Sequence, residues 1–504
     1  MRRSLWLSSL LCLGSMALPR ADAGAQTIPI RTVPVASGDQ FLMMPSATLG
    51  MGGTRLAIED SLGGAWSNPA KGALISESSF LGSPTYYSIS EGGGGGRTFP
   101  VAGLFAGTRW FGGAALALQQ IENTDGDDLF FPAPGVTEPA IDICCFQCCG
   151  GPARTLSETY GRNVYAAGFV GRRLVDGWSF GIGASTAQLG AMDGVDLLYS
   201  GSERIEQSGT LGDVRVGLYR AATRDRLSLL LLHTRVSMVH EVTWLDWVWD
   251  PATMRSFTRR RVEANEDETR TWGAHAAWSR DLTTEGWRVG ASGTLNYKDH
   301  PKIPDYSLQN IPRDPGTTWA YEAAFGFSRT ADRTTFALDL ALQPIWTETW
   351  QVANAQDAAA SGGALAVGDR SIENDFFFTN VVIRSGLMHE ISGVRGQVGL
   401  EIRSYAYQLE QVNHVERSYR EQDEAWIEWS PTLGATYSFD ALDLRYTGRI
   451  TTGTGLPGTA SDWAFGPGLE SASGGDFVLA PGGPLTLQDA RVVTHQLSVR
   501  IPVR

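Results

Sequence analysis

The sequence predicts an all-β protein, a transmembrane antiparallel β-barrel of about 14–16 strands, on three observations. Many segments alternate apolar and polar residues, as a strand with two different faces does. After the N-terminal leader, no segment approaches the roughly 18 uninterrupted apolar residues of a membrane-spanning helix. The connections between segments alternate between short and long. A closed barrel is the way for such strands to cross a membrane, because it satisfies every backbone hydrogen bond.

The composition excludes some functions and agrees with an exported β-rich chain. The 504 residues include 59 Gly and 10% aromatic residues, and the formal net charge is -13. An acidic balance argues against nucleic acid as a partner, since phosphate binding needs a basic face. Residues 1–25 have the pattern of a signal peptide, with Arg2 and Arg3 before an apolar core and Ala21-Asp22-Ala23 as a cleavage pattern. The predicted location is therefore the bacterial outer membrane.

The alternating segments define the predicted strands. One example is Phe336, Leu338 and Leu340 on one face, with Ala337 and Asp339 on the other. The strands are expected at 79–89, 98–108, 111–122, 158–171, 178–191, 205–221, 226–243, 267–281, 286–299, 316–330, 333–350, 374–391, 395–411, 424–440, 441–455 and 490–502. A soluble sandwich would show the same alternation, so alternation alone does not indicate a membrane.

The connections favour the barrel over the sandwich. Short joints carry turn residues, as in Val175-Asp176-Gly177 and Ser392-Gly393. Long loops are expected near 122–158, 243–267, 299–316, 350–374, 411–424 and 455–490. Short turns at one end and long loops at the other are typical of outer-membrane barrels, with the short turns in the periplasm.

The polar faces of these strands should line the lumen with charges of both signs. The residues expected to point inward are Arg288, Asp339, Glu401, Arg403, Asp443, Arg445, Arg449 and Arg500. Mixed signs indicate a lumen held by ion pairs around a plug, rather than a wide pore lined by one sign of charge. Ordinary solvation of a water-filled lumen is the alternative.

The plug itself is predicted at residues 47–74, within an N-terminal extension at 26–78 that precedes the barrel at 79–504. Small residues cluster at 50–53 and 63–65 of this stretch, which lets its backbone approach a neighbour closely. Gly50-Met51-Gly52-Gly53, the acidic pair Glu59-Asp60, and Ala65-Trp66-Ser67-Asn68-Pro69-Ala70 resemble the N-terminal signature of FadL-like outer-membrane proteins. That superfamily includes long-chain fatty-acid transporters and the PorV-type proteins of a bacterial secretion system.

The resemblance implies a 14-stranded barrel with a hatch in its lumen, passive uptake of hydrophobic molecules, and a lateral opening in the wall. The residues that match the signature, and would therefore be hatch residues, are Gly50, Gly52, Gly53, Asp60, Asn68, Pro69 and Ala70. Lys71 departs from the Gly or Ala that is usual after the Asn-Pro-Ala step. The motif carries over no ligand-binding residue. As a glycine-rich turn with Asn-Pro, the same stretch would indicate no function.

All cysteines after the leader lie in one predicted loop, at Cys144, Cys145, Cys148 and Cys149. In an oxidising compartment they are expected to form disulfides, and four cysteines allow three pairings. The C-x-x-C spacing of Cys145 and Cys148 leaves a thiolate metal site as the alternative, but no histidine lies nearby. The sequence predicts no metal site and no cofactor.

The histidines are scattered and no nucleophile motif is present, so no enzyme is predicted. The expected function is a channel or transporter for hydrophobic small molecules such as fatty acids. Its expected partners are outer-membrane lipid and the hydrophobic ligand. A PorV-like barrel that serves secreted or surface-attached proteins, and a general porin, remain alternatives.

Overall fold

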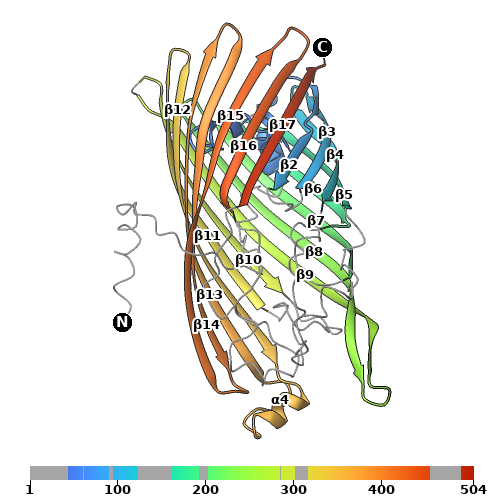
Figure 1. Ribbon diagram of the computed structural model, residues 1–504. Helices are drawn as coiled ribbons and strands as arrows, with labels where there is room; N and C mark the ends of the chain where they lie inside the picture. Colours follow the sequence, from blue (N-terminus) through green and yellow to red (C-terminus); the bar gives the residue numbers. More distant parts are fainter. Residues whose placement is uncertain are drawn as a thin grey trace, which may run out of the picture.

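The computed structural model describes residues 44–60, 62–89, 95–122, 160–191, 203–283, 285–300, 316–454 and 490–503. These residues form one antiparallel sheet that closes on itself, with short helical turns inside it (Figure 1). The predicted leader, the four loop cysteines and the loops 122–158, 299–316 and 455–490 fall wholly or mostly outside the described residues. No helix among the described residues is long and apolar enough to span a membrane.

Seventeen strands form the sheet. Their bounds are β1 Ser79–Gly82, β2 Thr85–Ile89, β3 Gly95–Ala106, β4 Trp110–Glu122, β5 Tyr160–Arg173, β6 Trp178–Leu189, β7 Arg204–Ala221, β8 Asp225–Asp250, β9 Arg255–Asp281, β10 Trp287–His300, β11 Gly316–Ala331, β12 Thr334–Val352, β13 Arg370–Ile391, β14 Val394–Asn413, β15 Ser418–Ser438, β16 Asp443–Thr454 and β17 Ala490–Pro502. Each consecutive pair from β2 to β17 is hydrogen-bonded. The prediction of an all-β antiparallel barrel is confirmed.

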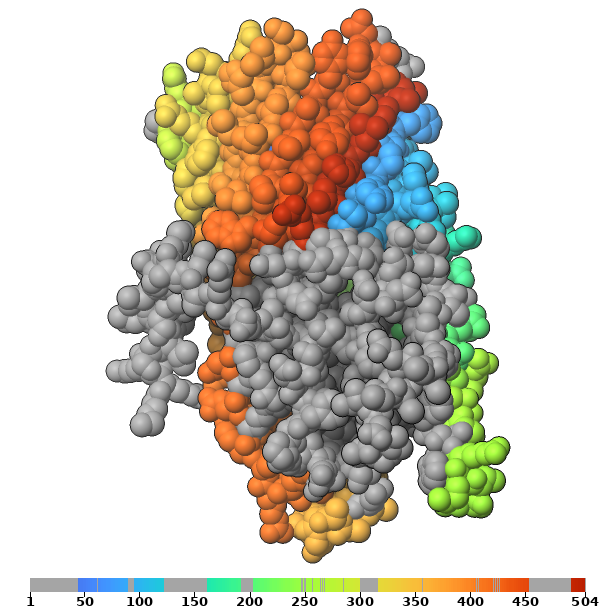
Figure 2. All heavy atoms as spheres, in the orientation of Figure 1, coloured from blue at the N-terminus to red at the C-terminus, as the bar shows by residue number. Residues whose placement is uncertain are grey.

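The barrel has 16 positions around its circumference, because β1 and β2 share one of them. Both pair with β17 on one side and with β3 on the other, and Ser83-Pro84 interrupts them. Proline cannot donate to a sheet ladder, which accounts for the break. This contact between the first and last strands closes the wall, and Figure 2 shows β17 directly against the N-terminal strands. The count is the upper value of the predicted range, not the 14 that the resemblance implied.

The short turns lie at the upper end of Figure 1 and the longer connections at the lower end, where the helix α4 (Ala355–Ala360) joins β12 to β13. Two predicted long loops are wrong. Residues 243–267 continue β8 and β9 as a paired hairpin that turns only at 251–254, and residues 411–424 continue β14 and β15 up to a turn at 414–417. The second stretch is polar and charged, and the first holds Trp244, Trp247 and Trp249 among charged residues without a regular alternation. Outside the bilayer a strand needs no apolar face, so cross-strand pairing extends the ladder without an alternating pattern.

The outer face of the wall is apolar. On β12, Phe336, Leu340 and Trp346 are 40%, 49% and 48% exposed, whereas Ala337 and Ala341 on the opposite face are buried. Phe336 and Trp346 are aromatic residues at the two ends of this apolar stretch. Their spacing corresponds to about 33 Å along a strand, or about 25 Å of height at a tilt of about 40°. An apolar band of that height, bounded by aromatic residues, is what an outer-membrane barrel presents to lipid.

Candidate gate inside the barrel

Residues 44–78 precede the first strand and lie against the inner wall near the short turns. They contain three helical turns, η3 (Leu49–Met51), α2 (Gly64–Ser67) and η4 (Pro69–Leu74). Asn68 caps η4, since its Oδ1 accepts a hydrogen bond of 3.0 Å from Ala70 N, and Pro69 occupies the first helical position. Proline is suited to that position because its fixed φ fits the helix and no donor is lost. The Asn-Pro-Ala step of the sequence motif therefore starts a helical turn.

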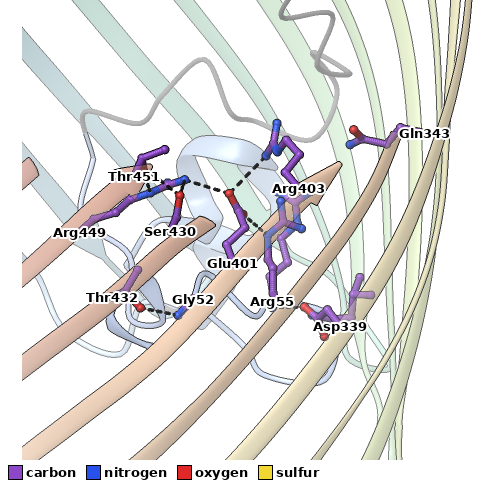
Figure 3. Close-up of polar contacts among 12 residues, drawn as sticks. Gly52, Arg55, Asp339, Gln343, Glu401, Arg403, Ser430, Thr432, Arg449 and Thr451 are labelled. Atoms are coloured by element: carbon purple, nitrogen blue, oxygen red, sulfur yellow. Dashed lines mark hydrogen bonds and ion pairs between the residues drawn. The ribbon is translucent and has the colours of Figure 1, made fainter. Parts of the chain in front are cut away.

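The N-terminal part of the segment docks on β13, β14 and β15 through backbone contacts (Figure 3). Gly52 N donates to Thr432 Oγ1 at 2.9 Å, and Thr432 Oγ1 donates to Gly50 O at 3.1 Å. Gly52 has a left-handed φ of 68°, and a Cβ there would lie 2.7 Å from Leu400 O. On the wall, a Cβ at Gly399 would lie 2.1 Å from Gly52 N. Glycine on both surfaces is what allows the two backbones to touch.

The middle of the segment is held by charged groups. Arg55 N and Leu56 N donate to Asp339 Oδ2 at 2.6 and 3.2 Å, and the Arg55 side chain lies 3.6 Å from a carboxylate oxygen of Glu322. Farther along, Glu59 forms an ion pair of 3.4 Å with Arg226 and accepts a hydrogen bond from Tyr219. Wall side chains therefore supply partners for backbone groups that would otherwise lie unpaired inside the barrel.

Asp60 joins the two halves of the segment. Its Oδ1 accepts hydrogen bonds from Ala47 N at 3.0 Å, Leu62 N at 2.9 Å and Gly63 N at 3.0 Å. Ala47 precedes η3 and Gly63 precedes α2, so a single carboxylate oxygen ties the start of one turn to the start of the other. Hydrogen bonds to an ionised carboxylate are stronger than those between neutral groups.

The C-terminal part docks on β4 to β8 through buried side chains. Asn68 Nδ2 donates to Ser228 Oγ at 2.8 Å and to Leu229 O at 3.0 Å, which lie on β8. Trp66 is 5% exposed and makes an edge contact with Phe169, with 5.0 Å between ring centroids. The buried Arg215 forms an ion pair of 2.7 Å with Asp213. Its guanidinium also donates to Ser67 O at 2.9 Å.

The structure places the predicted lumen residues as follows. Asp339 and Glu401 are buried on the inner face, and Glu401 lies 2.6 Å from Arg384, 2.9 Å from Arg449 and 3.6 Å from Arg403. Figure 3 shows Arg403, from the same strand β14, and Arg449, from β16, both directed at Glu401. The others pair nearer the short turns: Arg288 with Asp281, Asp443 with Arg500, and Arg445 with the carbonyl oxygen of Ser46.

Of the predicted hatch residues, Gly50, Gly52 and Gly53 belong to the first docking region, Asp60 is the link, and Asn68, Pro69 and Ala70 belong to the second. Arg215, Arg384 and Glu322 also line the inner face, although they are not among the predicted lumen residues. All three stand at inward positions of alternating strands, so the period of two that identified the others also marks them.

Farther from the short turns, the inner wall carries two layers on β11 to β14. The first is a polar row in which Gln343 Nε2 donates to Glu322 Oε2 at 2.7 Å, and Asn380 is the cross-strand neighbour of Gln343. The second is a buried apolar cluster of Ala320, Ile345, Phe378 and Leu409, with Phe376 packed against it. A polar lumen is typical of such barrels, so an apolar cluster on the inner face is a departure that calls for an explanation.

No family model and no curated protein matches this chain. Solved structures similar to it include a Pseudomonas aeruginosa FadL homologue, with 12% identity, a TM-score of 0.42, and coverage of 91% of this chain and 99% of that one. The Ralstonia pickettii toluene transporter TbuX has 11% identity, a TM-score of 0.37 and coverage of 91% and 97%. The ferric-catecholate import receptor Fiu from E. coli K12 has 8% identity, a TM-score of 0.33 and coverage of 84% and 82%.

Their names describe a FadL homologue, a toluene transporter and an import receptor. Such low identities and TM-scores describe a general likeness among barrels. The closed wall and the apolar outer band are features of this chain's own structure. The chain is an outer-membrane type of β-barrel, and a FadL homologue is among the solved structures that it is similar to.

Proposed function

We propose that the protein is an outer-membrane channel for small hydrophobic molecules, fatty-acid-like solutes among them, and that residues 44–78 are the hatch that controls passage. In this proposal residues 1–25 are the export signal, residues 26–78 the N-terminal extension with the hatch, and residues 79–504 the barrel. Solutes cross by passive diffusion in this proposal, as the resemblance of residues 47–74 to FadL-like proteins implies.

The observation that supports the proposal most is the apolar cluster on the inner wall. A lumen that only conducts water and ions has no use for Ile345 and Phe378 on its inner face, where each is at most 4% exposed. Apolar side chains with a few polar groups beside them are the usual lining of a site for a hydrophobic ligand. The cluster lies beyond the docked segment as seen from the short turns, so a solute that enters from the long-loop end would reach it first.

The experiment has two arms. Mass spectrometry of an organic extract of the purified protein should find hydrophobic molecules enriched over an empty detergent control. Cells that express the protein should also take up a radiolabelled medium-chain fatty acid or toluene faster than cells that carry Phe378→Ala, by about tenfold at equal surface expression.

Phe336→Ala is the matched control, because it makes the same truncation on the lipid-facing side of the adjacent strand β12 and should leave uptake unchanged. Equal uptake by the two variants would contradict the proposal. A large steady conductance in planar bilayers would instead indicate an open general porin.

A second candidate function, a PorV-like partner for secreted or surface proteins, draws support from the β8–β9 hairpin. That hairpin remains paired as far as Asp250 and Arg255, whereas the pairing of β7 with β8 ends at Thr243. It therefore projects beyond its neighbour on one side, as the lower right of Figure 1 shows. Co-purification of a secreted protein that is lost when residues 245–260 are replaced by a short turn would favour this candidate.

A further inference from the structure

Three tryptophan–arginine pairs lie on the outer face of the wall, at its short-turn end. In each pair the tryptophan is the first residue of a strand that leaves a short turn, and the arginine is its neighbour near the end of the next strand. In all three the guanidinium carbon lies over the tryptophan ring, 5.5 Å from the ring centroid. The pairs, which we call the outer arginine belt, are Trp110 with Arg172, Trp178 with Arg220, and Trp287 with Arg329.

The belt adjoins the apolar band that faces lipid. Two positions before the three arginines, on the same strands, stand Val170, Leu218 and Phe327, and the first two are 54% and 37% exposed. Arg329 is also the cross-strand neighbour of Phe336, the aromatic residue that bounds the band on β12. Side chains two positions apart on a strand share a face. The arginines therefore stand where the lipid-facing surface meets the level of the head groups.

The belt arginines differ from other arginines at this end of the barrel. Among the residues that the structure describes, the side chains of Arg172, Arg220 and Arg329 are exposed and form no ion pair. On the inner face, by contrast, Arg288 pairs with Asp281 at 2.5 Å. The charge of each belt arginine is therefore available to a partner from outside the chain.

A guanidinium stacked on an aromatic ring is well suited to a phosphate. Stacking uses the flat face of the guanidinium and leaves its N–H groups at the edge, where two of them can donate to two phosphate oxygens. Tryptophan itself is enriched at the level of the head groups. A phospholipid that placed its phosphate on Arg172 would lay its acyl chains on Val170, and one on Arg220 would lay them on Leu218.

We propose that the outer arginine belt binds the phosphate groups of anionic phospholipids in the leaflet around the short turns. The short turns of outer-membrane barrels lie on the periplasmic side, so this is the periplasmic leaflet. A zwitterionic phospholipid carries the same phosphate together with a cation that an arginine repels. Anionic phospholipid is therefore the preferred partner. The inference concerns the outer wall, and it holds or fails independently of transport through the lumen.

Native mass spectrometry of the full-length protein in detergent measures the preference. The probes are phosphatidylglycerol and phosphatidylcholine with identical acyl chains, each titrated separately. Phosphatidylglycerol should bind the wild-type protein about fivefold more tightly than phosphatidylcholine. The ratio should fall when ammonium acetate is raised from about 0.05 M to about 0.5 M, because salt screens exposed charges.

Substitution of the belt arginines tests their role. In a triple variant with Arg172→Gln, Arg220→Gln and Arg329→Gln, the affinity for phosphatidylglycerol should fall to that for phosphatidylcholine. The affinity for phosphatidylcholine should change little. Heat-modifiable gel mobility shows whether the barrel is folded. Each of the three single variants should lose part of the preference, which keeps the test decisive if the triple variant does not fold.

The matched control removes three exposed arginines at the long-loop end, Arg260→Gln, Arg370→Gln and Arg417→Gln. It changes the net charge by the same amount and should leave the preference for phosphatidylglycerol unchanged. Equal affinities of the wild-type protein for the two lipids would overturn the inference. A preference that persists in the belt variants, or an equal loss in the control variant, would also overturn it.

Discussion

The two docking regions of the N-terminal segment attach it to the wall in different ways. Near Gly52 the contact is backbone against backbone, with glycine on both surfaces and Thr432 as the bridging side chain. Near Trp66 and Asn68 the contact consists of buried side chains in an apolar cluster and a hydrogen-bonded pocket. The second region also leads directly into β1, so the chain itself anchors it.

This difference assigns separate roles to the two regions. Burial of large apolar side chains contributes most of the stability at such a contact. Backbone contacts between glycines bury little apolar area and depend on close fit. We therefore expect the region around Trp66 to stay attached and the region around Gly52 to be the end that detaches. The following predictions test that asymmetry, from the largest effect to the smallest.

Trp66→Ala should have the largest effect on stability. It removes a buried indole from a contact with Phe169 and leaves a cavity, which lowers the free energy of unfolding by about 3–5 kcal/mol. Urea unfolding monitored by heat-modifiable gel mobility measures the change. A loss below about 1 kcal/mol would mean that this region does not anchor the segment.

Gly399→Ala should detach the other region while the barrel remains folded. The added methyl group would lie 2.1 Å from Gly52 N, and overpacking of this kind costs about 1–3 kcal/mol. The expected result is increased single-channel conductance in planar bilayers with normal gel mobility. Gly212→Ala is the control, because a Cβ at that wall glycine meets nothing within 4 Å. Unchanged conductance in Gly399→Ala would show that this region is not the mobile end.

Lys71 should make the smallest contribution, and it should depend on pH. Burial lowers the pKa of its ammonium group below the ordinary 10.5, although Glu59 and Asp60 oppose the shift. The unfolded chain then binds more protons than the folded one between the lowered pKa and 10.5, so stability should rise with pH through that window.

Lys71→Met should remove this dependence and be more stable than the wild-type protein below the window. The urea midpoint of unfolding, measured for both proteins from about pH 8 to about pH 11, tests this pH dependence. If the midpoint fell with rising pH in the wild-type protein and not in Lys71→Met, the lowered pKa of Lys71 would be contradicted.

The strands themselves could be predicted closely. The predicted 178–191 and 490–502 correspond to β6 at Trp178–Leu189 and β17 at Ala490–Pro502. Their boundaries follow from alternation, which reflects a wall with lipid on one side and a polar lumen on the other. The alternation of apolar and polar residues ends where a strand leaves the bilayer. The pattern therefore predicts a loop at the extensions of β8 and β9 toward Asp250 and Arg255, although cross-strand pairing continues there.

The candidate gate also has one part that the sequence predicts and another that it does not. The glycines and the Asn-Pro-Ala step of residues 47–74 indicated a segment that approaches another backbone closely. They did not indicate that Gly399 on β14 is its partner, because that contact joins residues hundreds of positions apart. The apolar cluster was not predicted either. The period of two places Ile345 on the same face as Asp339, but only the cross-strand register brings it opposite Phe378.

The sequence by itself determined that the chain is a barrel, which residues alternate on its strands, and that a glycine-rich segment precedes the first of them. These are local properties, set by side-chain periodicity and turn residues over a few positions. Only the tertiary structure decided that the wall has 16 positions, that Asp60 ties the two halves of the segment together, and that Ile345 lies opposite Phe378 in a buried apolar cluster. Closure of the sheet brings distant strands into register, and no local pattern encodes which residues then meet.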